Sequence, residues 1–195
     1  MVVLITTVFK GSAVIQAIKL FSPQRVYFLI DEPLNEIRNQ TINMIKEFFP
    51  TLDFKSISAK VYNIVDIAKE TIDIIEKEKN EEIIIHVSEG RKTMGFGLLF
   101  GAYMMSEHVK AAYYLEEETN PPIQLPLTKL KVPDQKRKLL DLIFQGINDV
   151  KDIEKRLEIT ASTVYVHMKE LRDEGFLDKD NKITDIGKIV LLRRD

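Results

Sequence analysis

The sequence predicts an α/β protein: a Rossmann-like, mostly parallel sheet followed by a C-terminal winged helix-turn-helix. Two observations predict this fold class. Up to residue 115, short apolar runs rich in β-branched residues alternate with segments whose apolar residues recur at helical spacing. Beyond Pro133 the pattern changes to three short helical segments and a small hairpin. Alternating strands and helices imply right-handed crossovers, and therefore a parallel sheet covered on both faces.

Five strands are expected in the first part of the chain. Each is short and mostly apolar, as buried strands are. Helical segments separate them; the first spans Gly11–Leu20 and is stopped by Pro23, and the second is ended by Pro50. The expected strands are Val2–Thr7, Arg25–Asp31, Leu52–Ser58, Glu81–Ser88 and Val109–Leu115.

A change of composition near Glu116 divides the chain. The segment EEETNPPIQLPLTKLKVP holds four prolines and predicts an extended connector, although IQLPL within it is compatible with a short extra strand. We therefore expect a Rossmann-like domain over residues 1–118, a Pro-rich connector over 119–133 and a winged helix-turn-helix domain over 134–195.

The composition excludes several classes of protein. The 195 residues are 45% hydrophobic and 30% charged, as in a globular protein with a substantial core, and the net charge of −2 excludes a generally basic coat. The absence of cysteine excludes disulfides, thiolate metal sites and cysteine nucleophiles. The N-terminus has no basic leader, and no apolar run approaches ~18 residues, so we expect a cytoplasmic protein without membrane association.

Polar residues gather where the first and fourth strands end. TTVFKGS follows the first strand, and SEGRKT follows the fourth and leads into an apolar, glycine-dotted helix. Because carboxyl ends of parallel strands lie on one rim, the two loops can line a single site. Arg91 and Lys92 would stand at a helix N-terminus, where free backbone N–H groups also attract anions. We expect an anion site; a solvated basic turn, and an ordinary turn with Ser12 as N-cap, are the alternatives.

The spacing of glycines is not that of a known nucleotide fingerprint. SEGRKT is not a Walker A loop, and Gly95, Gly97 and Gly101 lie inside the helix rather than in the turn before it. Gly97 and Gly101 are spaced to let another element approach closely. The helix is apolar nearly all round, which is compatible either with burial in the core or with a homodimer interface.

Enzyme chemistry has little support in the sequence. His86, His108 and His167 lack the spacing of metal ligands, and no GxSxG elbow is present. His86 lies inside an apolar strand and is expected to be a core histidine. We expect no catalytic residue, no metal and no cofactor.

The most specific pattern is ITASTVYVHMKELRDEGFL near the C-terminus, which has the order of a helix-turn-helix ending at Gly175. From residue 133 onward there are 13 basic and 13 acidic residues, and Asp178 and Asp180 lie at the expected wing tip. A single copy should therefore bind DNA weakly, because affinity grows with the number of phosphate contacts. A winged helix used only for protein contact is the alternative. The candidate DNA-contacting residues are Ser162, Thr163, Tyr165, Val166 and Lys169.

Both halves resemble known domains. TVYVHMKELRDEGFL and ITDIGK resemble winged helices of the MarR/ArsR kind. TTVFKGS and SEGRKTM resemble the two marks of CARF domains, the CRISPR-associated Rossmann-like ligand sensors. In combination the chain is similar to the archaeal, Csa-type CARF–winged-helix transcription regulators. It departs from them in two places: Glu89 stands where a Gly-Gly pair is frequent, and Val166 where the recognition helix frequently has Arg.

The resemblance implies a homodimer that binds a cyclic oligoadenylate, usually the cyclic tetra-adenylate, across its two-fold axis. It also implies binding to double-stranded promoter DNA and control of CRISPR-cas genes in antiviral defence. An effector-binding enzyme that slowly cleaves the ring, with Ser12 and Lys92 as actors, and a regulator of another small nucleotide are the alternatives. The ligand-binding residues implied are Thr7, Phe9, Lys10, Gly11, Ser12, Ser88, Glu89, Gly90, Arg91, Lys92, Thr93 and Met94.

Overall fold

The computed structural model describes residues 1–31, 33, 36–115 and 122–193. The chain divides into two compact units, Met1–Lys129 and Leu130–Asp195. The first residues of the expected connector, Thr119–Pro121, lie outside the described residues, whereas IQLPL does contain a short strand, β6.

The first unit is built on one six-stranded sheet with the order β3-β2-β1-β4-β5-β6. Strands β1 to β5 are parallel, and β6 pairs antiparallel with β5. The predicted fold class, a mostly parallel Rossmann-like sheet, is confirmed. The strands are β1 Val2–Thr7, β2 Arg25–Asp31, β3 Asp53–Ala59, β4 Glu82–His86, β5 Val109–Tyr114 and β6 Ile123–Leu125.

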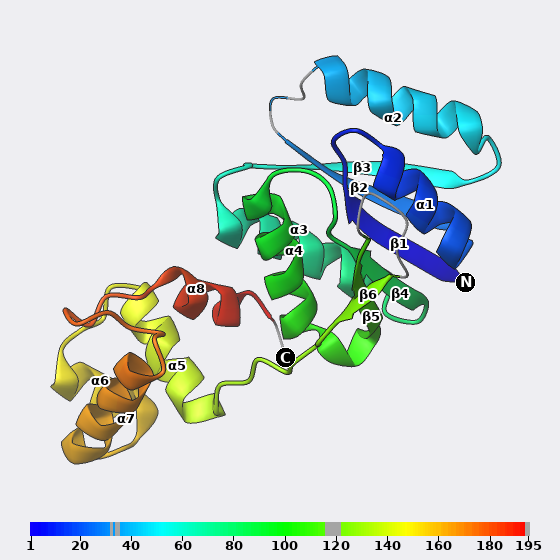
Figure 1. Ribbon diagram of the computed structural model, residues 1–195. Helices are drawn as coiled ribbons and strands as arrows, with labels where there is room; N and C mark the ends of the chain where they lie inside the picture. The colour runs from blue at the N-terminus through cyan, green and yellow to red at the C-terminus, as the bar shows by residue number, and fades with distance from the viewer. Residues whose placement is uncertain (32, 34–35, 116–121, 194–195) are drawn as a thin grey trace. The chain divides into compact units, whose positions relative to one another are not determined.

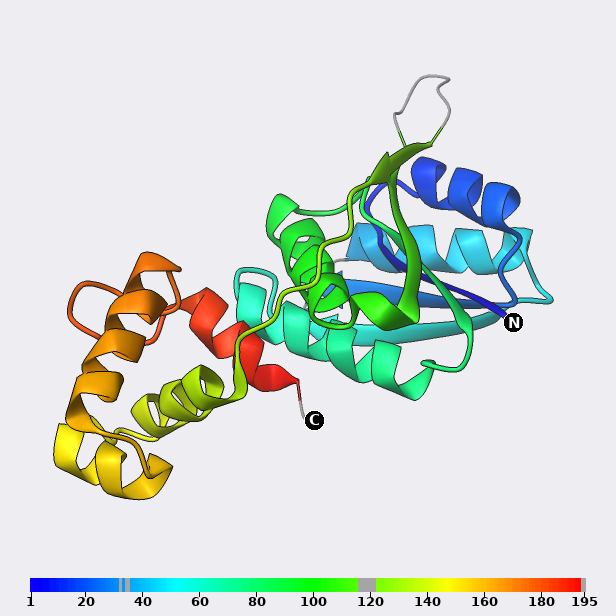
Figure 2. The same cartoon turned by 90° about the horizontal axis from the view of Figure 1, so that it is seen from below.

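Helices cover both faces of this sheet (Figure 1, turned by 90° in Figure 2). Helices α1 and α2 pack on one face, and α3 and α4 lie on the other. A short 3-10 turn, η1, leads into β5. The bounds are α1 Ser12–Phe21, α2 Glu36–Phe48, α3 Ile64–Lys77, α4 Lys92–Met104 and η1 Ser106–His108.

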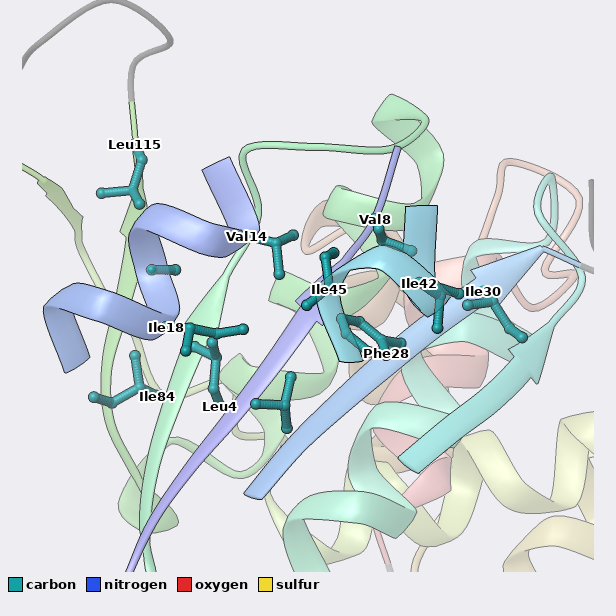
Figure 3. Packing of buried hydrophobic residues seen from close by; sticks show 12 residues of the cluster. Leu4, Val8, Val14, Ile18, Phe28, Ile30, Ile42, Ile45, Ile84 and Leu115 are labelled. Atoms are coloured by element: carbon teal, nitrogen blue, oxygen red, sulfur yellow. The ribbon is translucent and has the colours of Figure 1, made fainter. Parts of the chain in front are cut away.

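The core beneath α1 and α2 is formed by alternate strand residues and the apolar stripes of the two helices (Figure 3). Leu4 and Phe28 from the strands meet Val14 of α1 and Ile45 of α2, and all four are fully buried. Side chains that alternate along a strand face opposite sides of the sheet, so the odd-numbered residues of β1, such as Ile5, serve the other face. This packing fixes the sheet and therefore the positions of the strand ends.

The order of the strands reverses between β1 and β4. From β1 the chain proceeds to β2 and β3 on one side, and it then returns to β4 and β5 on the other. Thr6 of β1 is in register with His86 of β4, so both strands end side by side. In open parallel sheets, ligands bind at the carboxyl ends of the strands flanking such a reversal.

Helix α4 packs against α3 through its glycines. A Cβ atom on Gly97 would lie 2.5 Å from Ile67, and one on Gly101 would lie 2.5 Å from Thr71. The close approach that the glycine spacing predicts is therefore made by α3 of the same chain, not by a second copy. The opposite side of α4 is more open, since Phe96 is 54% exposed and Leu99, Phe100 and Tyr103 are partly exposed.

We expect Gly101→Ala to lower the free energy of unfolding by about 1–3 kcal/mol, as overpacking does. The new methyl group would lie 2.5 Å from the Thr71 side chain and 2.9 Å from the Ala68 carbonyl oxygen, and the latter cannot rotate away. Gly95→Ala is the matched control in the same helix, because its Cβ would find its nearest neighbour at 3.7 Å. Denaturant unfolding should show the control unchanged or more stable. Equal stabilities for the two variants would contradict this packing.

The described part of the second unit, up to residue 193, contains four helices: α5 Asp134–Phe144, α6 Val150–Leu157, α7 Ala161–Asp173 and α8 Asp185–Leu192. Their buried residues include Leu139, Ile153, Val164 and Ile189. The segment beginning DIGK, which follows the wing, forms α8.

The wing is smaller than expected. Two short strands were predicted in FLDKDNKIT, but the chain forms a single antiparallel bridge between Leu177 and Ile183. The reason is the turn itself: the Asp178 carboxylate accepts hydrogen bonds from the backbone N–H groups of Asp180 and Lys182, each at 2.8 Å. Asn181 takes a left-handed conformation with φ 60°. Because the turn is so tight, the two segments form no longer β-ladder. The Asp178 carboxylate is engaged by these backbone N–H groups.

Candidate functional site

The loops after β1 and β4 meet, as the sequence predicts for neighbouring strands. The hydroxyl of Thr7 donates a hydrogen bond to the carbonyl oxygen of Glu89. Gly90 follows with φ 86°, and a Cβ atom there would lie 3.0 Å from Cβ of Thr7. Glycine is needed at this position because the backbone is left-handed and the two loops touch.

Glu89 closes the start of α1. Its carboxylate accepts hydrogen bonds from the backbone N–H groups of Phe9, Gly11 and Ala13 at 2.7–2.8 Å. The alternative in which Ser12 caps this helix is wrong, because Gly11 is the N-cap and makes no side-chain cap hydrogen bond. Free N–H groups at a helix start need an acceptor, and here a carboxylate from the neighbouring loop supplies it. The N-terminus of α1 is thus already occupied by a negative charge of the protein.

The N-terminus of α4 differs. Its N-cap is Arg91, which makes no side-chain cap hydrogen bond, and Lys92 is the first helical residue. Both side chains are exposed. The Thr93 hydroxyl donates to the carbonyl oxygen of Val61 at 2.6 Å, which ties α4 to the loop before α3. Two cations and the helix start therefore face the same region, and no acidic side chain of the described residues caps this helix.

An open cleft of about 500 Å³ lies at this rim. Its walls come from the ends of β1 and β4 and also from α2 and the loop before α3. The lining residues are Phe9, Arg38, Tyr62, Gly90, Arg91, Lys92 and Thr93.

Asp31, at the end of β2, holds two arginines of the cleft. It forms an ion pair with Arg38, and Nε of Arg91 lies 3.7 Å from the same carboxylate oxygen. Asp31 and Arg38 are 8% and 5% exposed, so this pair is screened little by solvent. The Arg38 guanidinium lies 5.6 Å from the centre of the Phe9 ring, and that of Arg91 lies 5.4 Å from the centre of the Tyr62 ring.

The sequence-predicted ligand residues fall into four groups in the structure. Five line the cleft: Phe9, Gly90, Arg91, Lys92 and Thr93. Four others support the loops. Thr7 and Glu89 do so through the hydrogen bonds described above, and Gly11 is the N-cap of α1. The hydroxyl oxygen of Ser88 accepts a hydrogen bond from the Leu115 N–H at 2.5 Å. Met94 is 1% exposed and belongs to the core. Lys10 and Ser12 are exposed and are not among the residues that line the cleft.

Sequence reasoning missed Asp31, Arg38 and Tyr62. Asp31 carried a usable signal, since it ends a predicted parallel strand on the same rim. Arg38 lies within a helix and Tyr62 in a loop, and neither belongs to a local pattern that marks a site.

His86 is a core residue, as expected. It is fully buried at the end of β4, and Nδ1 lies 2.8 Å from the Thr6 hydroxyl. The Thr6 hydroxyl also donates to the Thr7 carbonyl oxygen, which leaves Nδ1–H as the donor toward Thr6. Nε2 is buried and has no hydrogen-bond partner among the residues that the structure describes. Burial lowers the pKa of His86 to about 4, so the ring is neutral near pH 7.

We expect His86 to make the protein acid-sensitive between pH 6.5 and about 4. Above that window the ring is neutral in both the folded and the unfolded chain and contributes nothing. As pH falls through it, only the unfolded chain takes up the proton, so the free energy of unfolding drops by roughly 3 kcal/mol. His86→Gln should lack this component when unfolding is measured across the window. Parallel stability curves for the two proteins would refute the assignment.

In the second unit, α7 carries the candidate DNA-contacting residues on its open side. Tyr165 and Val166 are 61% and 52% exposed, and Ser162 and Lys169 are also exposed. Thr163 is half-buried, and its N–H and hydroxyl bond to the N-cap Thr160. The buried residues Val164, Met168 and Leu171 hold the other side of α7 to the core.

Residues 2–120 match the family model described as "HFX_2341_N:-like, N-terminal", which spans more than half of the chain. The chain belongs to this family. C-terminal to the HFX_2341_N-like domain in the sequence, residues 133–179 match the model "HTH_5: Bacterial regulatory protein, arsR family". The predicted winged helix is thereby confirmed as one of the ArsR kind.

Two solved structures share the fold of this HFX_2341_N-like protein. One is Can2 from Sulfobacillus thermosulfidooxidans in complex with cyclic tetra-adenylate, with TM-score 0.53 and 17% identity over 98% of this chain and 57% of that chain. Another is a type III CRISPR defence DNA nuclease activated by cyclic oligoadenylate, with TM-score 0.50 and 14% identity over 88% of this chain and 30% of that chain. The chain thus spans less than two thirds of either. A search of curated protein sequences finds no match.

These findings confirm the resemblance at the level of fold: an N-terminal domain with CARF-type structural neighbours precedes an ArsR-type winged helix. Among the described helices, none is both long and apolar enough to cross a bilayer. No cluster of three or more potential metal-ligating side chains occurs within the described parts of the chain.

Proposed function

We propose that this chain is a cytoplasmic, ligand-responsive transcription regulator of CRISPR-cas genes. It binds a cyclic oligoadenylate, with the cyclic tetra-adenylate as the expected ring, and it binds double-stranded DNA through the ArsR-type winged helix. The observation that carries the proposal is the cleft at the strand-order reversal, where Arg91 and Lys92 flank an α4 N-terminus that no acidic side chain of the described residues caps. Two structural neighbours, one in complex with cyclic tetra-adenylate and the other activated by cyclic oligoadenylate, support the choice of ligand.

The chemistry of the cleft favours an anionic ligand. α1 is closed by Glu89, so its positive end is neutralised within the protein. The N-terminus of α4 has two cations instead. In an isolated helix such cations are destabilising by a few tenths of a kcal/mol, because they repel the positive end of the helix dipole. A bound phosphate would turn this repulsion into a net attraction. Phosphate groups of the ligand would take the place that Glu89 takes at α1.

A ring of phosphates with two-fold symmetry calls for donors from two copies of the chain. The partly open side of α4 supports a homodimer, because Phe96, Leu99, Phe100 and Tyr103 are spaced to form one apolar stripe. This stripe begins one turn after Lys92. A two-fold contact along it would bring two Arg91–Lys92 pairs to one ligand.

Ligand binding would act on DNA by linkage. If the ring binds one arrangement of the dimer better than another, it shifts the relative positions of the two winged helices, and DNA shifts ring affinity by the same factor. The Arg91–Lys92 turn and α7 would then be the two coupled sites.

The alternative of a ring-cleaving enzyme needs Ser12 and Lys92 at one substrate. Lys92 lines the cleft, whereas Ser12 is exposed at the start of α1 and is not among the lining residues. This arrangement favours the regulator. Linear products after incubation with cyclic tetra-adenylate would reverse that preference.

The deciding experiment is calorimetry of the full chain with cyclic tri-, tetra- and hexa-adenylate. We expect the tetra-adenylate to bind with one ring per two chains. If the hexa-adenylate bound most tightly, the proposed effector would be the six-membered ring instead of the tetra-adenylate. If no ring bound, the proposal of a cyclic oligoadenylate effector would be rejected.

We expect the double variant Tyr165→Ala/Lys169→Ala to weaken retention of promoter DNA about 10-fold in a gel-shift assay, because both side chains lie on the exposed side of α7. Ring binding should stay unchanged. Lys188→Ala is a suitable control, since that lysine lies on α8 and pairs with Asp185 at 2.9 Å. Equal retention by the double variant and the control would exclude α7 as the DNA-contacting element and favour the protein-contact alternative.

A further inference from the structure

Two aromatic side chains at the mouth of the cleft are exposed. Tyr62, in the loop between β3 and α3, is 72% exposed, and Phe9, in the loop after β1, is 46% exposed. A single exposed aromatic residue is ordinary on a protein surface. These two, however, line one cleft together with three cations, Arg38, Arg91 and Lys92. Flat apolar rings beside cations suit a ligand that is aromatic in one part and anionic in another.

One carboxylate arranges both aromatic residues. Oδ2 of Asp31 contacts Arg38, which lies over Phe9, and it lies 3.7 Å from Nε of Arg91, which lies over Tyr62. The Phe9 ring is therefore linked to Asp31 through the buried Arg38, and the Tyr62 ring is linked to the same carboxylate more loosely through Arg91. Such an arrangement lowers the conformational cost of binding, because the rings are placed before the ligand arrives.

The two arginines are not equivalent. Arg38 is 5% exposed and holds Asp31 directly, so it acts as a positioning residue between Phe9 and the carboxylate. The Arg91 side chain is 51% exposed, and its 3.7 Å separation from Asp31 is too long for a hydrogen bond. Arg91 thus keeps guanidinium N–H groups for a phosphate while its Cζ lies over the Tyr62 ring, 5.4 Å from the ring centre. This places an anion-binding group and an aromatic ring side by side.

We propose that Tyr62 is a base-stacking residue of the site, with Phe9 as a second platform, so that the cleft selects a nucleotide over a simple polyanion. This inference rests on the proposed function, in which the ring supplies both bases and phosphates. A base would stack on the face of Tyr62 that Arg91 leaves open while its phosphate meets Arg91 and Lys92. Stacking of a base on an aromatic side chain, reinforced by a neighbouring arginine, supplies affinity without requiring base-edge hydrogen bonds.

The test uses the full chain and a cyclic tetra-adenylate in which one adenine is replaced by 2-aminopurine, whose fluorescence is quenched on stacking. The wild-type protein should quench the probe on binding. Tyr62→Ala should bind the ring about 10- to 100-fold more weakly and quench less, whereas Tyr62→Phe should retain both properties. Inorganic triphosphate should compete weakly and to the same extent in the wild type and in Tyr62→Ala, because it has no base.

Phe48→Ala is the matched control: that side chain is 65% exposed at the end of α2, and its removal should leave ring affinity and quenching unchanged. Wild-type binding together with unchanged affinity and quenching in Tyr62→Ala would overturn the stacking role and leave the proposed effector in place. Triphosphate that competes as well as the ring would likewise overturn selection of the base. Failure of the wild type to bind any oligoadenylate ring would overturn both proposals.

Discussion

The double variant Arg91→Ala/Lys92→Ala should lose cyclic oligoadenylate binding by about 100-fold or more while it unfolds at the wild-type temperature. Both side chains are exposed at the start of α4, and each charge-assisted contact to a phosphate contributes roughly 1.5–3 kcal/mol. Their contribution to folding is small, because the ion pair of Arg91 with Asp31 is long, at 3.7 Å, and the Arg91 side chain is 51% exposed. Calorimetry and thermal unfolding on the same sample measure the two effects.

The control for this variant removes two positive charges elsewhere in the unit. Lys19 and Lys46 lie in the last turns of α1 and α2, so Lys19→Ala/Lys46→Ala changes the net charge equally without touching the cleft. If both double variants weaken binding to the same degree, the effect is one of overall charge. If neither does, the cleft is not the effector site.

Removal of the Glu89 carboxylate should strongly lower the stability of the fold, rather than the affinity for the ligand. Glu89→Ala leaves the N–H groups of Phe9, Gly11 and Ala13 without their acceptor, and we expect the free energy of unfolding to fall by about 3 kcal/mol. Glu89→Gln keeps one acceptor oxygen and should lose about half as much. Denaturant unfolding measures the series, with the exposed Glu47→Ala as a control for the loss of an acidic residue.

The same variants test why Glu89 stands where CARF domains frequently have a Gly-Gly pair. If Glu89 acted chiefly by repelling the ligand, Glu89→Gln would bind the ring more tightly at unchanged stability. In the structure its oxygens are directed to backbone donors of α1, so its charge is balanced locally. Unchanged stability in Glu89→Ala would show that these bonds contribute little and would reopen a direct role toward the ligand.

Much of the fold could be predicted because its signals are local. The β-branched runs give the strands, and the helical stripe of Val14 and Ile18 gives α1. The meeting of TTVFKGS with SEGRKT also followed from the sequence, since parallel strands place their carboxyl ends on one rim. The wing was overestimated because alternation suggested strands, while Asp178 satisfies the backbone of a tight turn instead.

The partners of each site residue could not be predicted in the same way. The spacing of Gly97 and Gly101 shows that some element must come close, but only the packing identifies α3 as that element. Likewise a glutamate beside two cations was expected to face the ligand, and the hydrogen bonds direct it to α1.

The sequence by itself determined the α/β sheet, the winged helix that follows and the two cations at the start of α4, because periodicity and strand-end chemistry act over a few residues. Tertiary structure alone decided that Arg38 and Tyr62 join those cations in one cleft, and that Asp31 pairs with the two arginines of that cleft. The physical reason is that β1, β2, β3 and β4 end on a common rim, and the contacts across that rim join residues distant in the chain that no local pattern connects.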